Sequence, residues 1–486
     1  MATILQEPYI LNDFTGGVID DIAVAGGLLP RNAVRKGINV VFDRPRGSIS
    51  QRLGTTQLGN TVSASNTING LYNFRSSTAA KNQLLAAAIT KVFYLNSGTW
   101  TDSLTGLTTG LKTRFFTYLD TVVVLNGTDA VKSSTDPGAA SWVSTGGNLD
   151  VGNFPITKFA TILNTRVLAA GNSTNPDTVY ESSLEASNAV SWTSGNRSLK
   201  VFPNDGNGNI TSLTGNGRLA LIFKERATYR YDGDQLQRIA NIGTTSHESV
   251  ISDDSGITHF FGTGSGGIGF YRTSGAYPTK ISRAITRYVE AIDPAFYQHI
   301  NAFTDGNKIY WNVGSITIDN TTYTNARLVF SIADESWSVD NLADRFRVCA
   351  QYVTSTGAVT NVGGDTDGMV QTINSGTTDN GTAISSECET GMLVFTTRGR
   401  VKTVKEIVAL AKHYQGLTVL IKVDDGAFKK IMSISGPETK TTDMPIMRGK
   451  RFFLKITASN SGTAFEFEGF EIPNIIDEGY SYGKQR

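Results

Sequence analysis

Short runs of apolar residues recur along the chain, and each run is bounded by glycine, asparagine, aspartate or serine. The runs are rich in β-branched and aromatic side chains, while the spacing that marks an amphipathic helix is nearly absent. Many runs come in pairs, as in "TVVVLNGTDAVKSS", where Asn126-Gly127 begins a polar turn after an apolar strand. The pattern therefore predicts a mainly β protein that is built from hairpins.

The paired runs repeat through the middle of the chain at intervals of about 30 to 60 residues, which bracket the ~40 to 50 residues of a propeller blade. We therefore predict a β-propeller over residues 63–385, in which each blade covers the faces of its neighbours. Six blades are favoured because the unit near Val122 can share a blade with its neighbour, and seven blades are the alternative. The first strands of the repeats are predicted to begin near Val92, Val122, Val167, Leu219, Thr258, Lys308 and Met369.

Two regions of different composition flank the repeats. Residues 386–486 include the run "TAFEFEGFEI". Its Phe465, Phe467 and Phe470 mix with glutamates, which is typical of antiparallel strands with one packed face and one wet face. We predict a small β-sandwich there. Residues 1–62 are rich in glycine and predict an N-terminal arm whose last strand closes the propeller ring.

Composition and charge narrow the functional classes. Lys and Arg together number 44 against 43 for Asp and Glu, so no global field draws the chain onto nucleic acid or an anionic membrane. The amino terminus lacks the secretory pattern and no apolar run approaches about 18 residues, which predicts a chain made in the cytoplasm. Cys349 and Cys388 match no metal-binding spacing and are expected to be free, buried thiols.

The sharpest motif is "FFGTGSGGIGFY", whose Gly262, Gly264 and Gly267 fit the G-x-G-x-x-G spacing of a phosphate cradle. A dinucleotide site needs a helix after the glycines, but "IGFYRTSGAYPTKIS" is typical of a strand, a turn and another strand. We therefore predict a hairpin turn at this place and no cofactor.

Other acidic turns raise the same choice between structure and ligand binding. "SDDSGITHF" fits an Asp-box pattern, in which Asp254 and Gly256 are predicted to fix a hairpin turn. "PNDGNGNI", which contains Asp205, lacks the glycine and the final acid of an EF-hand. A looser Ca²⁺ turn stays open there and at "GGDTDGM", with Asp365 and Asp367, against an ordinary polar loop.

No catalytic constellation is evident. The four histidines sit in no spacing of a zinc site and beside no recognisable nucleophile, so we predict no metal and no enzyme activity. His259 lies in an apolar strand and is expected to be a hydrogen-bonded core residue. A propeller glycosidase assembles its carboxylates from distant blades, so this enzyme class stays open as an alternative.

Three basic clusters are candidate contacts to a partner protein or to DNA in a channel, although each can equally be a solvated strand face. They consist of Arg44, Arg46 and Arg52 in "DRPRGSISQR", Arg398 and Arg400 with Lys402 and Lys405 in "TTRGRVKTVK", and Arg448, Lys450 and Arg451 in "MRGKRFFLK".

Several phrases resemble one known family. They are "F-x-G-G" at Phe14, Gly16 and Gly17, "NVVFD" at 39–43 and "GSISQRLG" at 47–54, with "GGIGFYRTSGAYPTKIS", "RLVFSIADESWS" and "RGKRFFLKITASNSGTAFEFEGFEI" further on. Together they resemble the tail hub or nozzle proteins of short-tailed bacteriophages, also called packaged-DNA stabilisation proteins. The resemblance implies a β-propeller with added β-domains that assembles as a six-fold ring below the portal and adaptor.

On this resemblance we expect a structural virion protein that continues the DNA channel, retains packaged DNA and conducts it during ejection. The expected partners are further copies in a hexameric ring, the adaptor and portal-side tail proteins, tail fibres or spikes, and double-stranded DNA that passes non-specifically through the lumen, with no small-molecule substrate. Its place would be the virion tail, after synthesis in the host cytoplasm. The alternative is a receptor- or glycan-binding propeller of the tail, including a glycosidase.

Overall fold

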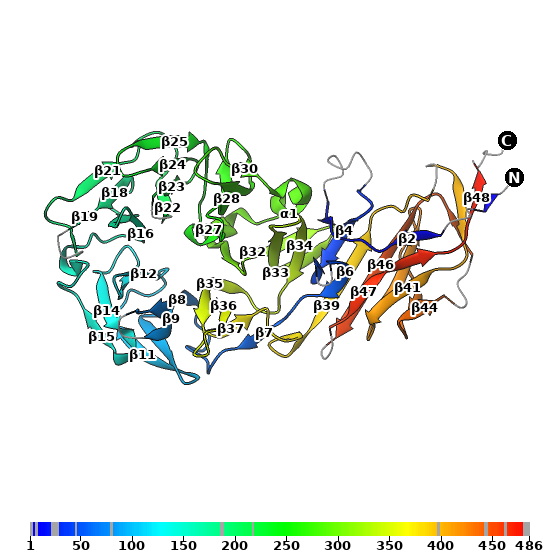
Figure 1. Ribbon diagram of the computed structural model, residues 1–486, viewed down its shortest axis with the longest axis horizontal. Helices are drawn as coiled ribbons and strands as arrows, with labels where there is room; N and C mark the ends of the chain where they lie inside the picture. The colour runs from blue at the N-terminus through cyan, green and yellow to red at the C-terminus, as the bar shows by residue number, and fades with distance from the viewer. Residues whose placement is uncertain are drawn as a thin grey trace.

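The computed structural model describes residues 3–4, 8–20, 29–43, 46–77, 81–184, 189–215, 218–395, 399–441, 446–460 and 464–479. Almost all regular structure in this part of the chain is β-strand, which confirms the mainly β prediction. Figure 1 shows small sheets arranged in a ring on one side and longer strands on the other. None of the described helices is long and apolar enough to cross a membrane. They are α1 (Thr286–Glu290) and the 3-10 helices η1 (Pro137–Ala139), η2 (Val151–Asn153), η3 (His247–Ser249), η4 (Ser282–Ile285) and η5 (Pro294–His299).

The ring consists of seven four-stranded antiparallel units, which we call blades one to seven. Blade one holds β8 (Ile68–Arg75), β9 (Asn82–Ala88), β10 (Lys91–Asn96) and β11 (Thr99–Thr105). Blade two holds β12 (Arg114–Tyr118), β13 (Thr121–Leu125), β14 (Lys132–Asp136) and β15 (Ser141–Val143). Blade three holds β16 (Phe159–Leu163), β17 (Arg166–Ala170), β18 (Thr178–Glu181) and β21 (Arg197–Lys200), and the pair β19 (Ser183–Leu184) and β20 (Val190–Ser191) is inserted before β21.

The remaining four blades complete the ring. Blade four holds β22 (Ile210–Gly215), β23 (Ala220–Lys224), β24 (Thr228–Tyr231) and β25 (Leu236–Ala240). Blade five holds β27 (Ile251–Ser252), β28 (Thr258–Gly264), β29 (Gly269–Thr273) and β30 (Thr279–Lys280), with β26 (Ile242–Gly243) also on β28. Blade six holds β31 (Asn301–Thr304), β32 (Lys308–Ile318), β33 (Thr321–Ser331) and β34 (Trp337–Asn341), and blade seven holds β35 (Phe346–Val353), β36 (Val359–Asp365), β37 (Val370–Ile373) and β7 (Thr55–Gln57).

The arrangement of the blades is that of a β-propeller. The first strands of blades one to four contact one another in order, and so do those of blades six and seven. Between blades four and six, the short helix η3 contacts the first strands of both, and β35 of the last blade contacts β8 of the first. The favoured count of six blades is wrong and the alternative of seven describes the strands, because the unit near Val122 forms a four-stranded sheet of its own. The seven predicted strand starts fall in seven different blades, but each lies at the second or third strand of its blade, so the prediction that they begin the first strands is wrong.

The fourth strand of blade seven comes from the other end of the chain. β7 pairs antiparallel with β37, and Thr56 lies opposite Thr372. This is the position expected for a ring-closing strand. Such pairing joins the first and last parts of the propeller by main-chain hydrogen bonds, so the ring has no open sheet edge at this point.

The rest of the N-terminal segment is woven into the C-terminal sheets. β4 pairs with both β34 of blade six and β39, while β2 and β6 both pair with β47. The predicted domain boundary at 385/386 falls inside β39. The N-terminal strands are β1 (Thr3–Ile4), β2 (Tyr9–Leu11), β3 (Gly17–Val18), β4 (Ala33–Ile38), β5 (Val40–Asp43) and β6 (Arg46–Gln51). The C-terminal strands are β38 (Thr378–Asp379), β39 (Thr382–Thr390), β40 (Val401–Val404), β41 (Val408–His413), β42 (Thr418–Val423), β43 (Lys429–Ser433), β44 (Glu438–Lys440), β45 (Met447–Gly449), β46 (Phe452–Asn460), β47 (Glu466–Ile472) and β48 (Ile475–Gly479).

The C-terminal strands pack their apolar side chains between the sheets. Phe465, Phe467 and Phe470 are all buried, while Glu468 is exposed, as the alternation predicts. The uneven spacing of the last two phenylalanines is explained by a register shift opposite Ala411, which turns both rings inward. One apolar cluster contains Phe467 together with Trp337 of blade six, so the sandwich and the propeller share a continuous core.

The glycine-rich motif is a hairpin. Strand β28 leads into it and strand β29, not a helix, follows, which confirms the predicted turn. Gly264 has φ +136°, and a Cβ there would lie 2.3 Å from the carbonyl oxygen of Asn241. The Tyr271 hydroxyl donates to the carbonyl oxygens of Gly266 and Gly267, at 2.7 and 2.9 Å. The glycines therefore allow a tight turn and close packing against blade four.

The acidic turn of blade five is also structural, but the residue that fixes it differs from the predicted Asp254. The neighbouring Asp253 accepts hydrogen bonds from the backbone nitrogens of Ser255 and Ile257, both at 3.0 Å. Its second carboxylate oxygen lies 3.0 Å from Nε2 of buried His259. His259 is thus a hydrogen-bonded core residue, as its strand position predicts.

Blade seven repeats this turn with the same spacing. Asp365 accepts from the backbone nitrogens of Asp367 and Met369, and its second oxygen accepts from Nε2 of Gln371 at 3.1 Å. At the other candidate Ca²⁺ turn, the Asp205 carboxylate contacts the Lys224 ammonium at 3.1 Å and the Tyr229 hydroxyl. The structure therefore favours the ordinary polar loop at Asp205, because a lysine already supplies the positive charge.

Candidate functional site

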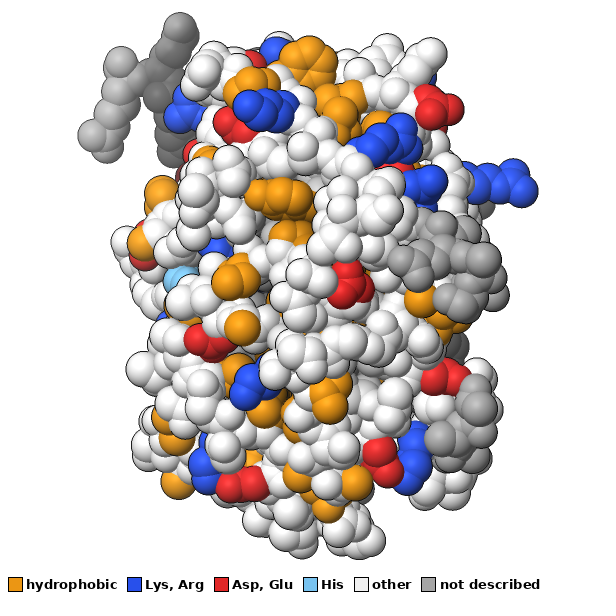
Figure 2. All heavy atoms as spheres, turned by 90° about the vertical axis from the view of Figure 1, so that its left-hand side faces the viewer, with side chains coloured by type: hydrophobic (Ala, Val, Ile, Leu, Met, Phe, Trp, Pro, Cys, Tyr) orange, Lys and Arg blue, Asp and Glu red, His pale blue; other side chains and the backbone are white. Residues whose placement is uncertain are grey.

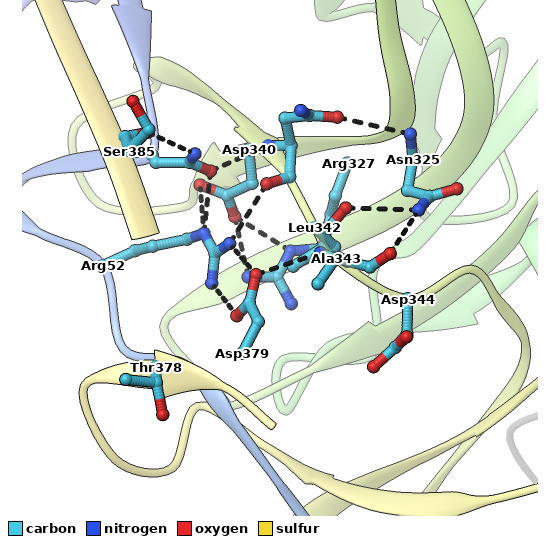
Figure 3. A network of polar contacts seen from close by, with 12 residues as sticks. Arg52, Asn325, Arg327, Asp340, Leu342, Ala343, Asp344, Thr378, Asp379 and Ser385 are labelled. Atoms are coloured by element: carbon cyan, nitrogen blue, oxygen red, sulfur yellow. Dashed lines mark hydrogen bonds and ion pairs between the residues drawn. The ribbon is translucent and has the colours of Figure 1, made fainter. Parts of the chain in front are cut away.

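Arg52, one of the predicted partner contacts, points into the protein. Only 3 % of its side chain is exposed, so the prediction that it contacts DNA or a partner protein is wrong for this chain as folded. The residue follows β6 and lies where blade six, the N-terminal strands and β38 meet, and Figure 3 shows its guanidinium between Asp340 and Asp379. We call this ionic cluster the junction network.

Arg52 makes a two-pronged contact with Asp379. Its Nη1 and Nη2 atoms donate to the two carboxylate oxygens at 2.7 and 2.6 Å. Its Nε atom donates to the Asn39 side chain at 2.8 Å, and the Asp340 carboxylate lies 3.7 Å away. Burial alone would lower the pKa of the Arg52 guanidinium, but the two carboxylates raise it above its usual range. The pair is therefore charged and geometrically fixed.

Asn39 connects the same network to the backbone of two strands, β34 and β39. It has φ +57° between β4 and β5, where asparagine is tolerated better than most residues. Its backbone nitrogen donates to the carbonyl oxygen of Val339 at 2.8 Å, and its side-chain nitrogen donates to the carbonyl oxygen of Ser385 at 2.7 Å. Its side-chain oxygen also accepts from the backbone nitrogen of Asn341 at 2.8 Å. One side chain therefore fastens blade six to β39.

A second buried ion pair completes the network. Nε of Arg327 in β33 donates to Oδ2 of Asp340 in β34 at 2.9 Å, and Nη2 of Arg327 lies 2.7 Å from the same oxygen. The Arg327 guanidinium also stacks over the Tyr310 ring, 5.0 Å from its centroid. A cavity of about 240 Å³ adjoins the network between propeller and sandwich, and Phe465 and His413 line its far wall.

The other predicted basic residues lie in or near the C-terminal sheets. Arg44 and Arg398 lie outside the described residues, and Arg46 begins β6. Strands β40 and β45 pair with Thr403 opposite Arg448, so this sheet does bring the two C-terminal clusters together.

Carboxylates accompany most of these cations. Arg400 lies 2.8 Å from Asp477, and Arg448 lies 2.6 Å from Glu478. Arg451 lies 2.6 Å from Asp425, and exposed Lys450 donates its backbone nitrogen to Asp424. Lys402 is buried. This edge is thus of mixed charge, and exposed pairs of this kind contribute little stability.

A second cavity, of about 590 Å³, opens among the beginnings of β12, β16 and β22 and the helices η3 and η5. These elements face the middle of the ring in Figure 1. We call it the inner cavity. The charged side chains that line it are Lys112, Arg114, Lys158, Glu225 and Glu248, together with His247 and His299.

Two further arginines stand behind the inner cavity at the beginning of β35. Arg347 contacts Nδ1 of His299 at 2.9 Å, and its carbonyl oxygen accepts from the Lys112 ammonium at 2.6 Å. Arg345 lies over the Phe296 ring, 4.3 Å from its centroid. Arg114 pairs with Glu248 at 2.6 Å, where both side chains are 17 % exposed.

Crowding of positive charge changes the titration of the cavity. Burial, with the cations Arg114 and Arg347 acting in the same direction, lowers the pKa of Lys112 to about 8. Burial and neighbouring cations also lower the pKa of His247 and of His299, each to about 4. Burial alone would raise the pKa of Glu248, but Arg114 and Lys112 hold it well below its usual range. The histidines are therefore neutral at pH 7 while Glu248 is ionised.

Sequence analysis missed these cations because they come from distant segments. The available signal was a pair of short alternations, "LKTRFF" around Lys112 and Arg114 and "DRFRV" around Arg345 and Arg347, each at the start of a strand. Alternation places such side chains on one face, but only the ring turns the two faces toward each other. Within the described residues, no group of three or more His, Cys, Asp or Glu is placed to hold a metal ion. Cys388 is buried, Cys349 is half-buried, and both are free.

No protein-family model and no curated protein matches this chain. Among solved structures, the CNH domain of AfRom2 is 11% identical with TM-score 0.38, covering 66% of this chain and 99% of that one. The structure of YjhT is 9% identical with TM-score 0.33, and the match covers 59% of this chain and 99% of that one. An exo-β-1,3-galactanase from Phanerochaete chrysosporium is 9% identical with TM-score 0.26, covering 86% and 98%. Likenesses this weak carry nothing about what this chain does.

Proposed function

We propose that this chain is a structural virion protein, a tail hub or nozzle that continues the DNA channel below the portal and adaptor. In this role it retains packaged DNA and conducts it during ejection. The observation that carries the proposal is the location of the phrases that resemble the tail hub family. Residues 39–43 and 47–54 supply Asn39 and Arg52, which hold the junction network together.

A hub needs a body that keeps its shape while DNA passes. The junction network ties blade six, β38 and β39 to one guanidinium and one amide, and the apolar core runs from propeller to sandwich without a break. Domains that move relative to one another usually meet across smaller and more polar interfaces. The build of this junction therefore supports a rigid structural role.

The surface charge is also compatible with a channel protein. On the side of the ring turned away from the sandwich, basic and acidic side chains are interspersed among uncharged ones (Figure 2). Each Lys or Arg contact to phosphate adds salt-sensitive affinity, and a lumen that conducts DNA must not hold it tightly. We place the contact with neighbouring tail proteins at the β40–β45 edge, where Arg448 and Arg451 are exposed.

Electron microscopy of the purified protein and of its virion tests this proposal. The expected result is a ring of one subunit number, six by the resemblance, which labelled protein places below the portal. A double variant, Arg448→Glu with Arg451→Glu, is expected to fold and to lose adaptor binding, with Lys91→Glu in blade one as the matched surface control. A monomer found at fibre tips would refute the hub.

The inner cavity favours one alternative, a glycan- or receptor-binding propeller. A volume of about 590 Å³ lies in the range of ligand sites, and Glu225 and Glu248 both line it. Incubation with host polysaccharides, followed by measurement of released reducing ends, separates the two functions. Release that is abolished by Glu248→Gln would replace the structural role with a glycosidase.

A further inference from the structure

The inner cavity holds an excess of positive charge that the proposed tail function does not use. Lys112 and Arg114 line it from blade two, Arg345 and Arg347 stand behind its wall at the start of β35, and Glu248 is the carboxylate among them. Lys158 and Glu225 add one charge of each sign at the lining. The lining itself has an excess of one positive charge, and the two arginines behind the wall bring the excess to three at pH 7, when both histidines are neutral.

These cations are held in place by groups that do not neutralise them. Lys112 donates to a carbonyl oxygen, Arg347 contacts a neutral imidazole, and Arg345 lies over an aromatic ring. In the described part of the chain, no carboxylate lies within 4.0 Å of any of the three. By contrast, Arg52, Arg327 and Lys224 in the interior all have carboxylate partners. The inner cavity differs from these three interior sites.

We propose that the inner cavity binds a ligand through a compact, multiply charged anionic group of the phosphate type. A cleft lined by one sign of charge focuses its field and concentrates counter-ions. Guanidinium groups present planar donors that match the oxygens of such a group, and a lysine adds a point charge. An excess of three charges fits a group with two or more negative charges better than a single carboxylate.

The size of the cavity adds a second property of the ligand. One phosphate-sized ion fills only a small part of about 590 Å³, so there is room for a larger molecule attached to the anion. Phe159 offers it an apolar wall, because its ring lies 4.8 Å from the Arg114 guanidinium and 4.6 Å from the His247 ring. The anionic group is thus expected to be the head of a small organic ligand, or a free pyrophosphate.

Binding should be linked to protonation of Lys112. The groups around it are Arg114 of β12, His247 and Glu248 of η3, His299 of η5, and Arg347 and Cys349 of β35. A bound anion raises the pKa of the ammonium above its value of about 8 in the free protein. Affinity is therefore expected to fall as the pH rises through 8, because binding then requires proton uptake.

Isothermal titration calorimetry of the full chain with pyrophosphate tests the proposal. We expect one site per chain, with affinity reduced at least about tenfold in Lys112→Met, since a hydrogen bond to a charged group contributes about 1.5 to 3 kcal/mol. A clear reduction is also expected in Lys158→Met, which removes an exposed cation of the cavity lining. Arg272→Gln is the matched control, because this half-buried propeller arginine pairs with exposed Glu335 and neither residue lines the cavity. The affinity of this variant should stay within about twofold of wild type. If Lys112→Met fails to fold, Lys158→Met decides the result.

Further arms identify the source of the anionic group. Tighter binding of a nucleoside triphosphate than of pyrophosphate would support an organic ligand, and equal affinity would support the free anion. Sulfate, whose charge is constant near neutral pH, should bind more weakly at about pH 9 than at about pH 7. Absence of binding by pyrophosphate and sulfate, equal binding by both cavity variants and wild type, or binding of single-stranded DNA alone would each overturn the proposal.

Discussion

Replacing Arg52 with methionine tests the junction network most directly. The guanidinium donates to both oxygens of Asp379, at 2.7 and 2.6 Å, and to Asn39 at 2.8 Å. Arg52→Met keeps much of the side-chain volume. It leaves Asp379, which is 5 % exposed, with a hydrogen bond from the backbone nitrogen of Ala343 at 3.1 Å but without the guanidinium. Asp340 retains Arg327. The variant therefore isolates one buried, uncompensated carboxylate.

The expected loss in the free energy of unfolding is about 3 to 5 kcal/mol, the range for removing one partner of a buried ion pair. Urea unfolding followed by tryptophan emission measures it, since Trp311 and Trp337 lie in the core that the junction adjoins. With a slope of about 3 kcal/mol/M, the urea midpoint should fall by about 1 to 1.7 M. The stability of Arg52→Lys should lie between those of wild type and Arg52→Met, because lysine keeps the charge and loses the two-pronged geometry.

Two controls decide whether burial and charge cause the loss. Arg272→Met removes an arginine whose partner Glu335 is 62 % exposed, so the expected change is at most about 1 kcal/mol. The double variant Arg52→Met with Asp379→Leu removes both charges and should recover part of the stability lost in Arg52→Met. If Arg52→Met and Arg272→Met have the same stability, the reasoning about the junction is wrong.

Three other substitutions test the turns and the sandwich. Gly264→Ala should lower stability by about 1 to 3 kcal/mol, because φ is +136° and the added Cβ meets the Asn241 carbonyl. Gly256→Ala, in open space at φ +80°, should lose only about 1 kcal/mol. Equal thermal midpoints of the two variants would contradict the steric argument. For Asp253, burial would raise the pKa, but hydrogen bonds from Ser255, His259 and Ile257 lower it, so its stabilisation is present above the unfolded pKa of about 4 and is lost as the pH falls below it. Asp253→Asn should therefore be about 1 to 3 kcal/mol less stable than wild type at pH 7, with the difference shrinking below about pH 4; a difference that is independent of pH would exclude the charge as its cause. Phe467→Ala removes a fully buried ring and should lower the free energy of unfolding in urea by about 3 to 5 kcal/mol. Glu468→Ala, at an exposed side chain, should change it by less than about 0.5 kcal/mol. Similar losses would show that the two strand faces are assigned wrongly.

The predictions at the junction and in the inner cavity concern separate parts of the molecule. Arg52 lines the cavity between propeller and sandwich, whereas Lys112 and Lys158 line the inner cavity. A failure of anion binding would therefore leave the tail hub proposal standing, and a monomeric particle would leave the anion site testable.

The sequence by itself determined the local structure. Hairpins, the glycine-rich turn and the alternation around Phe467 were all predictable, because their hydrogen bonds and burial involve residues a few positions apart. One strand of each blade was also visible, although it was the second or third strand and not the first. The error at Asp254 was small, since the carboxylate that fixes that turn is its neighbour Asp253.

Only the tertiary structure decided the blade count, the fate of Arg52 and the inner cavity. The last blade is completed by β7 from the far end of the chain, and Arg52 pairs with Asp379 across 327 positions. A basic residue in the sequence has no sign of its partner, because strand periodicity gives the face of a side chain but not what that face meets. The cavity arises for the same reason: its cations belong to blades that meet only when the ring closes.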